Sequence, residues 1–197
     1  MSSITFIPTV FSGTDNTNGG SIVWANPENV AVSDDNVALA TGPLFETPAI
    51  LTSLTLKVST WKYGGASIAK LIGAGDTLNS LTVSVERHAN GSAVDWYVKD
   101  AICQQYYGGA YAGTNLADTV NEWDGPPDGV SVDYLWNAAL PTTAQVRAAD
   151  YAFGIQVTML PLVDADILAN IDLITLTIDY TEVPPLGGHQ VIRMGIV

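Results

Sequence analysis

The sequence predicts an all-β protein, an antiparallel β-sandwich of jelly-roll type with extended N- and C-terminal arms. Short runs of alternating apolar and polar residues recur about every 8 to 15 residues, a pattern typical of strands with one buried face. Turn-forming residues separate these runs, and the chain contains 18 glycines and 10 prolines. No segment has the pattern of the long helices that connect parallel strands, so antiparallel pairing is expected.

The chain is expected to form one domain between two terminal segments. Its 197 residues, 47% of them hydrophobic, suffice for a single substantial core. We predict an N-terminal arm and loop over 1–19, a β-sandwich domain over 20–182 and a C-terminal arm over 183–197. Apolar residues alternate around Pro8, which suits an edge strand or an arm because proline lacks a backbone donor.

The clearest strand pattern lies between Leu78 and Cys103. Apolar residues alternate in two runs on either side of Asn90-Gly91, a dipeptide that favours tight hairpin turns. We therefore expect two antiparallel strands that pair with each other and bury one face. The residues expected on that face are Leu81, Val83, Val85, Val94, Trp96 and Val98.

Four further runs show the same alternation. The expected strands are Leu54 to Val58, Val130 to Trp136, Tyr151 to Val157 and Ile174 to Tyr180. Between them, 73–76 is expected to form a turn and 104–115 a long loop rich in glycine and tyrosine. The segment 141–149 is the one expected helical turn, capped by Thr142 or Thr143.

The charge of the chain bears on its partners and location. Twenty acidic and 7 basic residues give a net charge of −13, a field that repels phosphate. We therefore expect neither nucleic acid nor an anionic membrane as a partner. The first residues lack the basic and apolar regions of a signal peptide, and no apolar run approaches the ~20 residues of a spanning helix. The chain is expected to fold in a reducing cytoplasm.

Residues suited to catalysis are scarce. His88 and His189 lie far apart in the sequence, and no nucleophile elbow or phosphate-binding loop is present. Cys103 is the single cysteine, which excludes an intramolecular disulfide, and it is expected to be buried. A pair of carboxylates could in principle cleave glycosidic bonds, but the sequence does not single out a pair. We predict that the protein is not an enzyme.

No cofactor is expected either. Two histidines and one cysteine are too few for the usual zinc sites. A bound calcium ion stays open as an alternative, because carboxylates in loops are common calcium ligands. The loop carboxylates are Asp15, Asp34 and Asp35.

Aromatic residues offer a candidate ligand surface. Trp24 and Trp96 lie in regular strand patterns and are expected in the core. Other rings lie beside glycine-rich turns and are the better candidates for exposure, with core packing as the alternative; exposed rings can stack on sugars. The candidate glycan-binding residues are Trp61, Tyr106, Tyr107 and Tyr111.

The C-terminal segment is apolar and follows Pro184-Pro185. Apolar segments seldom remain in water, so we expect it to dock on a neighbouring subunit or add to a sheet edge. Its return onto its own domain is the alternative. The predicted assembly residues are Leu186, Val191, Ile192, Arg193, Met194, Ile196 and Val197.

An ordered set of motifs resembles a known family. The segment 20–40 reads G-x-x-x-W-x-N-P-x-N and then S-D-D-N-x-A, 81–89 reads L-x-V-x-V-E-R-x-A, and 169–180 reads A-x-I-D-x-I-x-L-x-I-x-Y. Together they resemble β-sandwich proteins encoded among the structural genes of tailed bacteriophages and prophages. The chain departs from this pattern at 128–134, where it lacks a Tyr-Gly-Gly sequence.

The resemblance implies a non-enzymatic structural component of a tailed-phage virion. Such a protein would decorate the capsid or belong to the neck or tail, and it would assemble in the cytoplasm of the host bacterium. Its implied partners are other virion proteins and further copies of itself in a symmetric homo-oligomer. The alternative from the residues alone is a carbohydrate-binding or receptor-recognition β-sandwich module.

Overall fold

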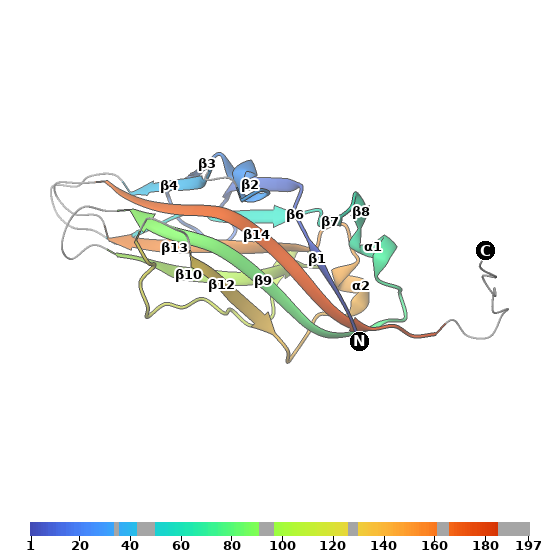
Figure 1. Cartoon of the computed structure of the whole chain (residues 1–197). Coiled ribbons are helices and arrows are strands. Elements are labelled where there is room, and N and C mark those ends of the chain that lie inside the picture. Colours follow the sequence, from blue (N-terminus) through green and yellow to red (C-terminus); the bar gives the residue numbers. More distant parts are fainter. Residues whose placement is uncertain (34–35, 43–49, 91–96, 126–129, 161–165, 185–197) are drawn as a thin grey trace.

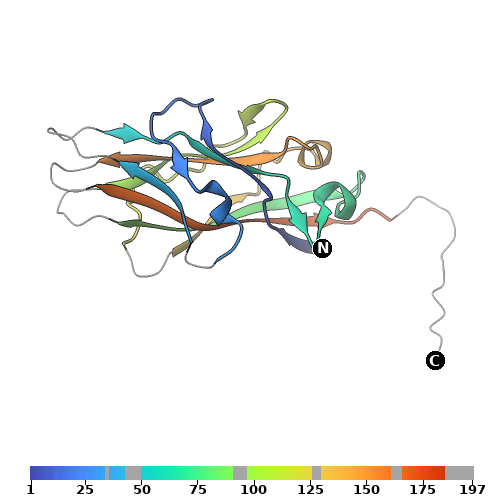
Figure 2. The same cartoon turned by 90° about the horizontal axis from the view of Figure 1, so that it is seen from above.

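The computed structural model describes residues 1–33, 36–42, 50–90, 97–125, 130–160 and 166–184. Within these residues the chain forms two six-stranded antiparallel sheets, packed face to face, and one small two-stranded sheet (Figures 1 and 2). The predicted antiparallel β-sandwich of jelly-roll type is confirmed.

The first sheet is built around the long strand β14 (Ile167–Thr181), which pairs with β9 (Thr77–Asn90) along nearly its whole length. On the other side of β14, its first half pairs with β4 (Ala38–Gly42) and its second half with β1 (Ser2–Phe6). The edges of this sheet are β12 (Val130–Trp136) beside β9 and β3 (Trp24–Ala25) beside β4.

The second sheet is built around β13 (Ala152–Leu160), which pairs with β10 (Tyr97–Tyr107) on one side. Its other side pairs with β6 (Thr55–Ser59) and with the short β5 (Leu51–Thr52). The edges are β11 (Ala110–Ala112) beside β10 and β2 (Val10–Asp15) beside β6.

Short elements close one end of the sandwich (Figure 1). They are the hairpin of β7 (Lys62–Tyr63) with β8 (Ala66–Ser67), and the helical turns α1 (Ile68–Leu71) and α2 (Thr143–Val146). A further 3-10 turn, η1 (Pro27–Val30), follows β3. Thr142 caps α2 in a capping box with Gln145, as expected. None of the described helices is long and apolar enough to cross a membrane.

The core contains the apolar side chains that the period-two alternation of the strands predicts to face inward. Each long strand turns every second side chain inward, so that both sheets contribute to one layer of apolar side chains. Trp24 is 2% exposed, and its indole N–H donates to the backbone oxygen of Leu54 at 2.8 Å, as expected for a core residue. The central side chains of this layer are Leu81, Val83, Val85, Phe153, Ile155, Val157, Ile174, Leu176 and Ile178.

The hairpin expected between Leu78 and Cys103 is wrong. Both runs are strands, but β9 belongs to the first sheet and β10 to the second. The pairing positions of β9 are occupied by β12 and β14, so β9 and β10 face each other across the core instead of bonding edge to edge. The expected turn, with Val94 and Trp96, lies outside the described residues.

The N-terminal segment contributes strands to both sheets. β1 pairs with β14 in the first sheet and β2 pairs with β6 in the second, so residues 2–15 are part of the sandwich, not a projecting arm. Pro8 lies between the two strands, where the chain passes from one sheet to the other and a missing backbone donor breaks no ladder. The segment 104–115 is also more regular than expected, because most of it forms the β10–β11 hairpin.

Candidate functional site

Two of the predicted aromatic residues, Tyr106 and Tyr111, lie together on the second sheet. They are directly opposite each other in the β10–β11 ladder, with ring centroids 5.2 Å apart and an edge-to-face angle of 77°. Lys57 of β6 reaches them from two strands away, and its Nζ lies 3.1 Å from the ring centroid of Tyr106. Asp15 of β2 completes what we call the tyrosine cluster: Asp15, Lys57, Tyr106 and Tyr111.

The tyrosine cluster occupies the outer face of the sheet. Phe153 and Ile155 of β13 point into the core, so Gly154 between them faces outward. The Tyr111 ring lies directly over Gly154, where an added Cβ would be only 2.4 Å from a ring carbon. Glycine at this position therefore lets the ring approach the backbone of β13 closely.

Hydrogen bonds and charge hold the cluster together. The Tyr111 hydroxyl donates to Asp15 Oδ2 at 3.1 Å, and Lys57 Nζ lies 3.8 Å from the same oxygen. Burial raises the pKa of Asp15, but hydrogen bonds from Thr17 and Tyr111 and the nearby Lys57 outweigh it, so the pKa is lowered overall. Burial and the Asp15 charge raise the pKa of Tyr111. Asp15 is therefore ionised and Tyr111 neutral at pH 7.

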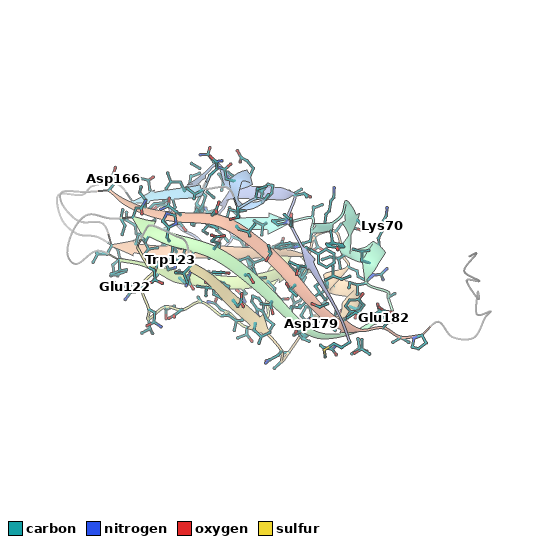
Figure 3. All side chains as sticks on the ribbon, viewed as in Figure 1. Lys70, Glu122, Trp123, Asp166, Asp179 and Glu182 are labelled. Carbon is teal, nitrogen blue, oxygen red and sulfur yellow. The ribbon has the colours of Figure 1, made fainter. Side chains whose placement is uncertain are left out.

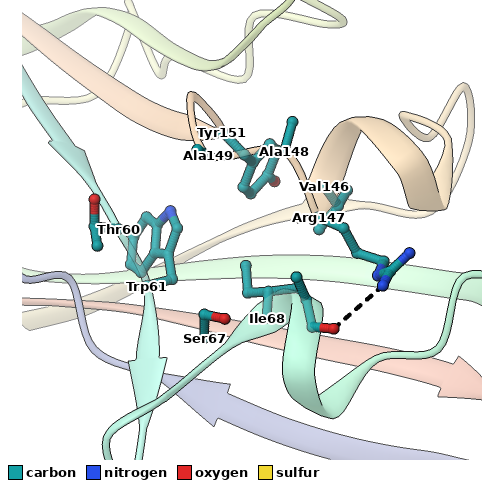
Figure 4. Close-up of a pocket in the computed structure, with 10 residues that line it drawn as sticks. Thr60, Trp61, Ser67, Ile68, Val146, Arg147, Ala148, Ala149 and Tyr151 are labelled. Atoms are coloured by element: carbon teal, nitrogen blue, oxygen red, sulfur yellow. Dashed lines mark hydrogen bonds between the residues drawn. The ribbon is translucent and has the colours of Figure 1, made fainter.

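The other two aromatic candidates lie elsewhere. Tyr107 is partly buried against the hydrophobic core, not on the outer face. Trp61 is only 2% exposed, so it belongs to the core, the alternative that the sequence left open, and it cannot stack on a sugar. It lines a pocket of about 230 Å³ at the closed end of the sandwich, beneath α1 and α2 (Figure 4). The glycine-rich turn that suggested exposure is the Gly64-Gly65 turn between β7 and β8, which begins three residues after Trp61.

A buried polar network joins the two sheets. Arg87 of β9 and Asp100 of β10 form an ion pair inside the core. Asp100 also accepts hydrogen bonds from Trp123 Nε1 at 2.8 Å and from the Tyr134 hydroxyl at 2.8 Å. The alternation could have shown that both side chains point inward, because Arg87 follows Val85 by two residues and Asp100 follows Val98 by two.

The remaining predicted chemistry is sparse. Cys103 is fully buried, and burial raises the pKa of its thiol well above its usual value. No group of three metal-binding side chains occurs among the described residues. Figure 3 shows that labelled charged side chains such as Lys70, Glu122 and Asp166 project outward. The predicted loop ligands Asp34 and Asp35, His189 and the assembly residues Leu186 to Val197 lie outside the described residues.

Comparison with known proteins gives similar solved structures, among them the two described below. No family model matches the chain, and no curated protein matches it. A solved structure described as "CBM4 structure and function" is 15% identical, with a TM-score of 0.38 over 87% of this chain and 94% of that chain. The N-terminal cellulose-binding domain of Cellulomonas fimi β-1,4-glucanase C is 15% identical, with a TM-score of 0.35 over 89% of this chain and 90% of that chain.

Proposed function

We propose that this protein is a non-enzymatic structural component of a tailed-phage virion that forms a homo-oligomer through its C-terminal residues. The resemblance to phage structural proteins rests on an ordered set of motifs, which includes 81–89 and 169–180. These two motifs are the paired centres of β9 and β14, with Leu81 opposite Ile178 and Val85 opposite Ile174. The motifs therefore describe the central strand pair of one sheet, which supports reading them as a single fold signature.

The observation that carries the proposal is the position of the apolar segment after the last strand. β14 ends at Thr181, and this strand lies in the middle of its sheet, with partner strands on both of its sides. The segment 186–197 then brings six large apolar side chains after β14: Leu186, Val191, Ile192, Met194, Ile196 and Val197. Contact with another subunit would remove this apolar surface from water.

Adding charge to the tail tests this proposal. Replacing Ile192 and Ile196 together with aspartate should weaken self-association by about 100-fold or more, because each buried apolar side chain contributes about 1.5–3 kcal/mol. Sedimentation velocity over a range of concentrations measures the change.

The matched control replaces His189 and Gln190 with aspartate, which adds the same charge at polar positions of the same tail. This control should associate like the unmodified chain, and all three proteins should unfold at similar temperatures. An unmodified chain that stays monomeric at high concentration, or equal weakening in both double variants, would contradict the proposal.

A second candidate function is saccharide recognition by the tyrosine cluster. Tyr106 is partly exposed on an open sheet face, beside the charged groups of Lys57 and Asp15. An aromatic ring next to hydrogen-bonding groups is the combination that binds sugars. The side of the Tyr106 ring that faces Lys57 is covered, so a sugar would stack on the other side.

Comparing two tyrosines tests this candidate. Replacing Tyr106 with alanine should weaken saccharide binding by about tenfold or more, because it removes the stacking surface. Tyr97 is the matched control, since it lies on the same strand with Lys99 Nζ 4.5 Å from its ring centroid. Isothermal titration calorimetry with soluble glycans measures saccharide binding by both variants. Absence of saccharide binding, or equal loss in Tyr97→Ala, would exclude this function.

A further inference from the structure

The pocket beneath α1 and α2 has walls that are mainly apolar. It lies between the two helical turns and the start of the β7–β8 hairpin, with a volume of about 230 Å³ (Figure 4). A buried apolar cavity of roughly 150 Å³ is enough to hold benzene. The pocket therefore has room for a six-membered ring with short substituents. Its lining includes Trp61, Ile68, Val146, Arg147, Ala148 and Tyr151.

Trp61 brings an unpaired hydrogen-bond donor to this pocket. Its indole Nε1 is buried and has no acceptor among the described residues. The other described tryptophans differ, because each donates to a protein oxygen: Trp24 to Leu54, Trp123 to Asp100 and Trp136 to Thr114. A buried donor without an acceptor is unfavourable, so an oxygen atom supplied by a ligand would be bound favourably there.

Arg147 brings a second unpaired donor and a positive charge. Its Nη2 donates to the backbone oxygen of Ala69 at 3.2 Å, which fixes the guanidinium group, while its Nε is buried without a partner. The ion pairs of the described residues involve Lys57, Arg87 and Lys99, but not Arg147. Figure 4 shows Trp61 and Arg147 on opposite sides of Ile68. The lining of the pocket therefore carries two unpaired donors, one on each side of Ile68.

We propose that this pocket binds a compact aromatic carboxylate with an oxygen acceptor at the far end of its ring. The carboxylate would accept from Arg147 Nε, the ring would lie against Ile68 and Val146, and the distal oxygen would accept from Trp61 Nε1. A charge-assisted bond to a guanidinium is stronger than a neutral hydrogen bond, so the carboxylate contributes most to affinity. This proposal is independent of the tyrosine cluster and of the C-terminal segment.

The test uses 4-hydroxyphenylacetate as the probe and the full chain labelled with ¹⁵N. The indole N–H signal of Trp61, identified by its loss in Trp61→Phe, should shift in a saturable way, with an expected Kd of about 1 mM. The signal of Trp24 should not move. Unchanged signals of the remaining indoles show that Trp61→Phe is folded.

Two comparisons make the test specific for charge. Arg147→Met should weaken binding by about tenfold or more, whereas Lys70→Met, which removes an exposed cation from α1, should change it less than twofold. The uncharged 4-hydroxyphenylacetamide should bind at least about tenfold more weakly than the acid. No saturable Trp61 shift, equal binding of the amide, or equal losses in Arg147→Met and Lys70→Met would overturn the proposal.

Discussion

Replacing Arg87 with methionine is expected to lower the free energy of unfolding by about 3–5 kcal/mol, because it leaves the Asp100 carboxylate buried without its counter-ion. Asp100 is 1% exposed and keeps only neutral donors in this variant, from Trp123, Tyr134 and the backbone N–H of Asp118. The Arg87 guanidinium also stacks on Trp123, 4.7 Å from its ring centroid. Denaturant titration measures the loss.

Lys99→Met is the matched control for this experiment. Lys99 lies one residue before Asp100 on β10, and its Nζ is 3.7 Å from a carboxylate oxygen of Glu122 at the surface. Removing such an exposed pair should cost less than about 1 kcal/mol. Similar losses in the two variants would show that Arg87 does not hold a buried ion pair. A larger loss for Arg87→Met shows that the buried Arg87–Asp100 ion pair stabilises the contact between β9 and β10. These two strands belong to different sheets and share no backbone hydrogen bonds.

Replacing Gly20 with alanine is expected to lower the free energy of unfolding by about 3 kcal/mol, the largest expected loss of stability after that of Arg87→Met. Gly20 has φ of +119°, and an added Cβ would lie 2.1 Å from the backbone oxygen of Ser53. The unfavourable backbone conformation and the forced shift of the backbone at Ser53, between β5 and β6, each cost about 1–3 kcal/mol. Gln156 adds to the effect, because its Nε2 donates to both Gly19 and Ser53 oxygens at 2.7 Å.

The adjacent Gly19 provides the control. It also has a positive φ, +74°, but an added Cβ would meet nothing within 4 Å. Gly19→Ala should therefore cost only about 1 kcal/mol, from backbone strain alone. Thermal and denaturant unfolding of both variants measures the difference. Equal stability of the two variants would contradict the close approach of Gly20 to Ser53.

The tyrosine cluster shows which of its residues the sequence could place near one another and which it could not. Tyr106 and Tyr111 could be chosen as a pair because they flank a Gly-Gly turn in one short segment. Lys57 and Asp15 could not be assigned to the same place, since they are distant in sequence and meet the tyrosines only through the order of strands in the sheet. Trp61 shows the opposite case. The turn that follows it in the chain is exposed, but its own side chain is buried.

The sequence by itself determined most of the long strands and which of their side chains are buried, although it assigned 2–15 to an arm and 104–115 to a loop. Period-two alternation places Leu81, Phe153 and Leu176 on an inward face whatever the neighbouring strand is, because side-chain direction follows from the backbone geometry of a single strand. The capping box at Thr142 is local in the same sense. Tertiary structure alone decided strand partners: it placed β9 and β10 in opposite sheets and brought Arg87 to Asp100. Pairing depends on competition among all strand edges at once, and no local pattern contains that information.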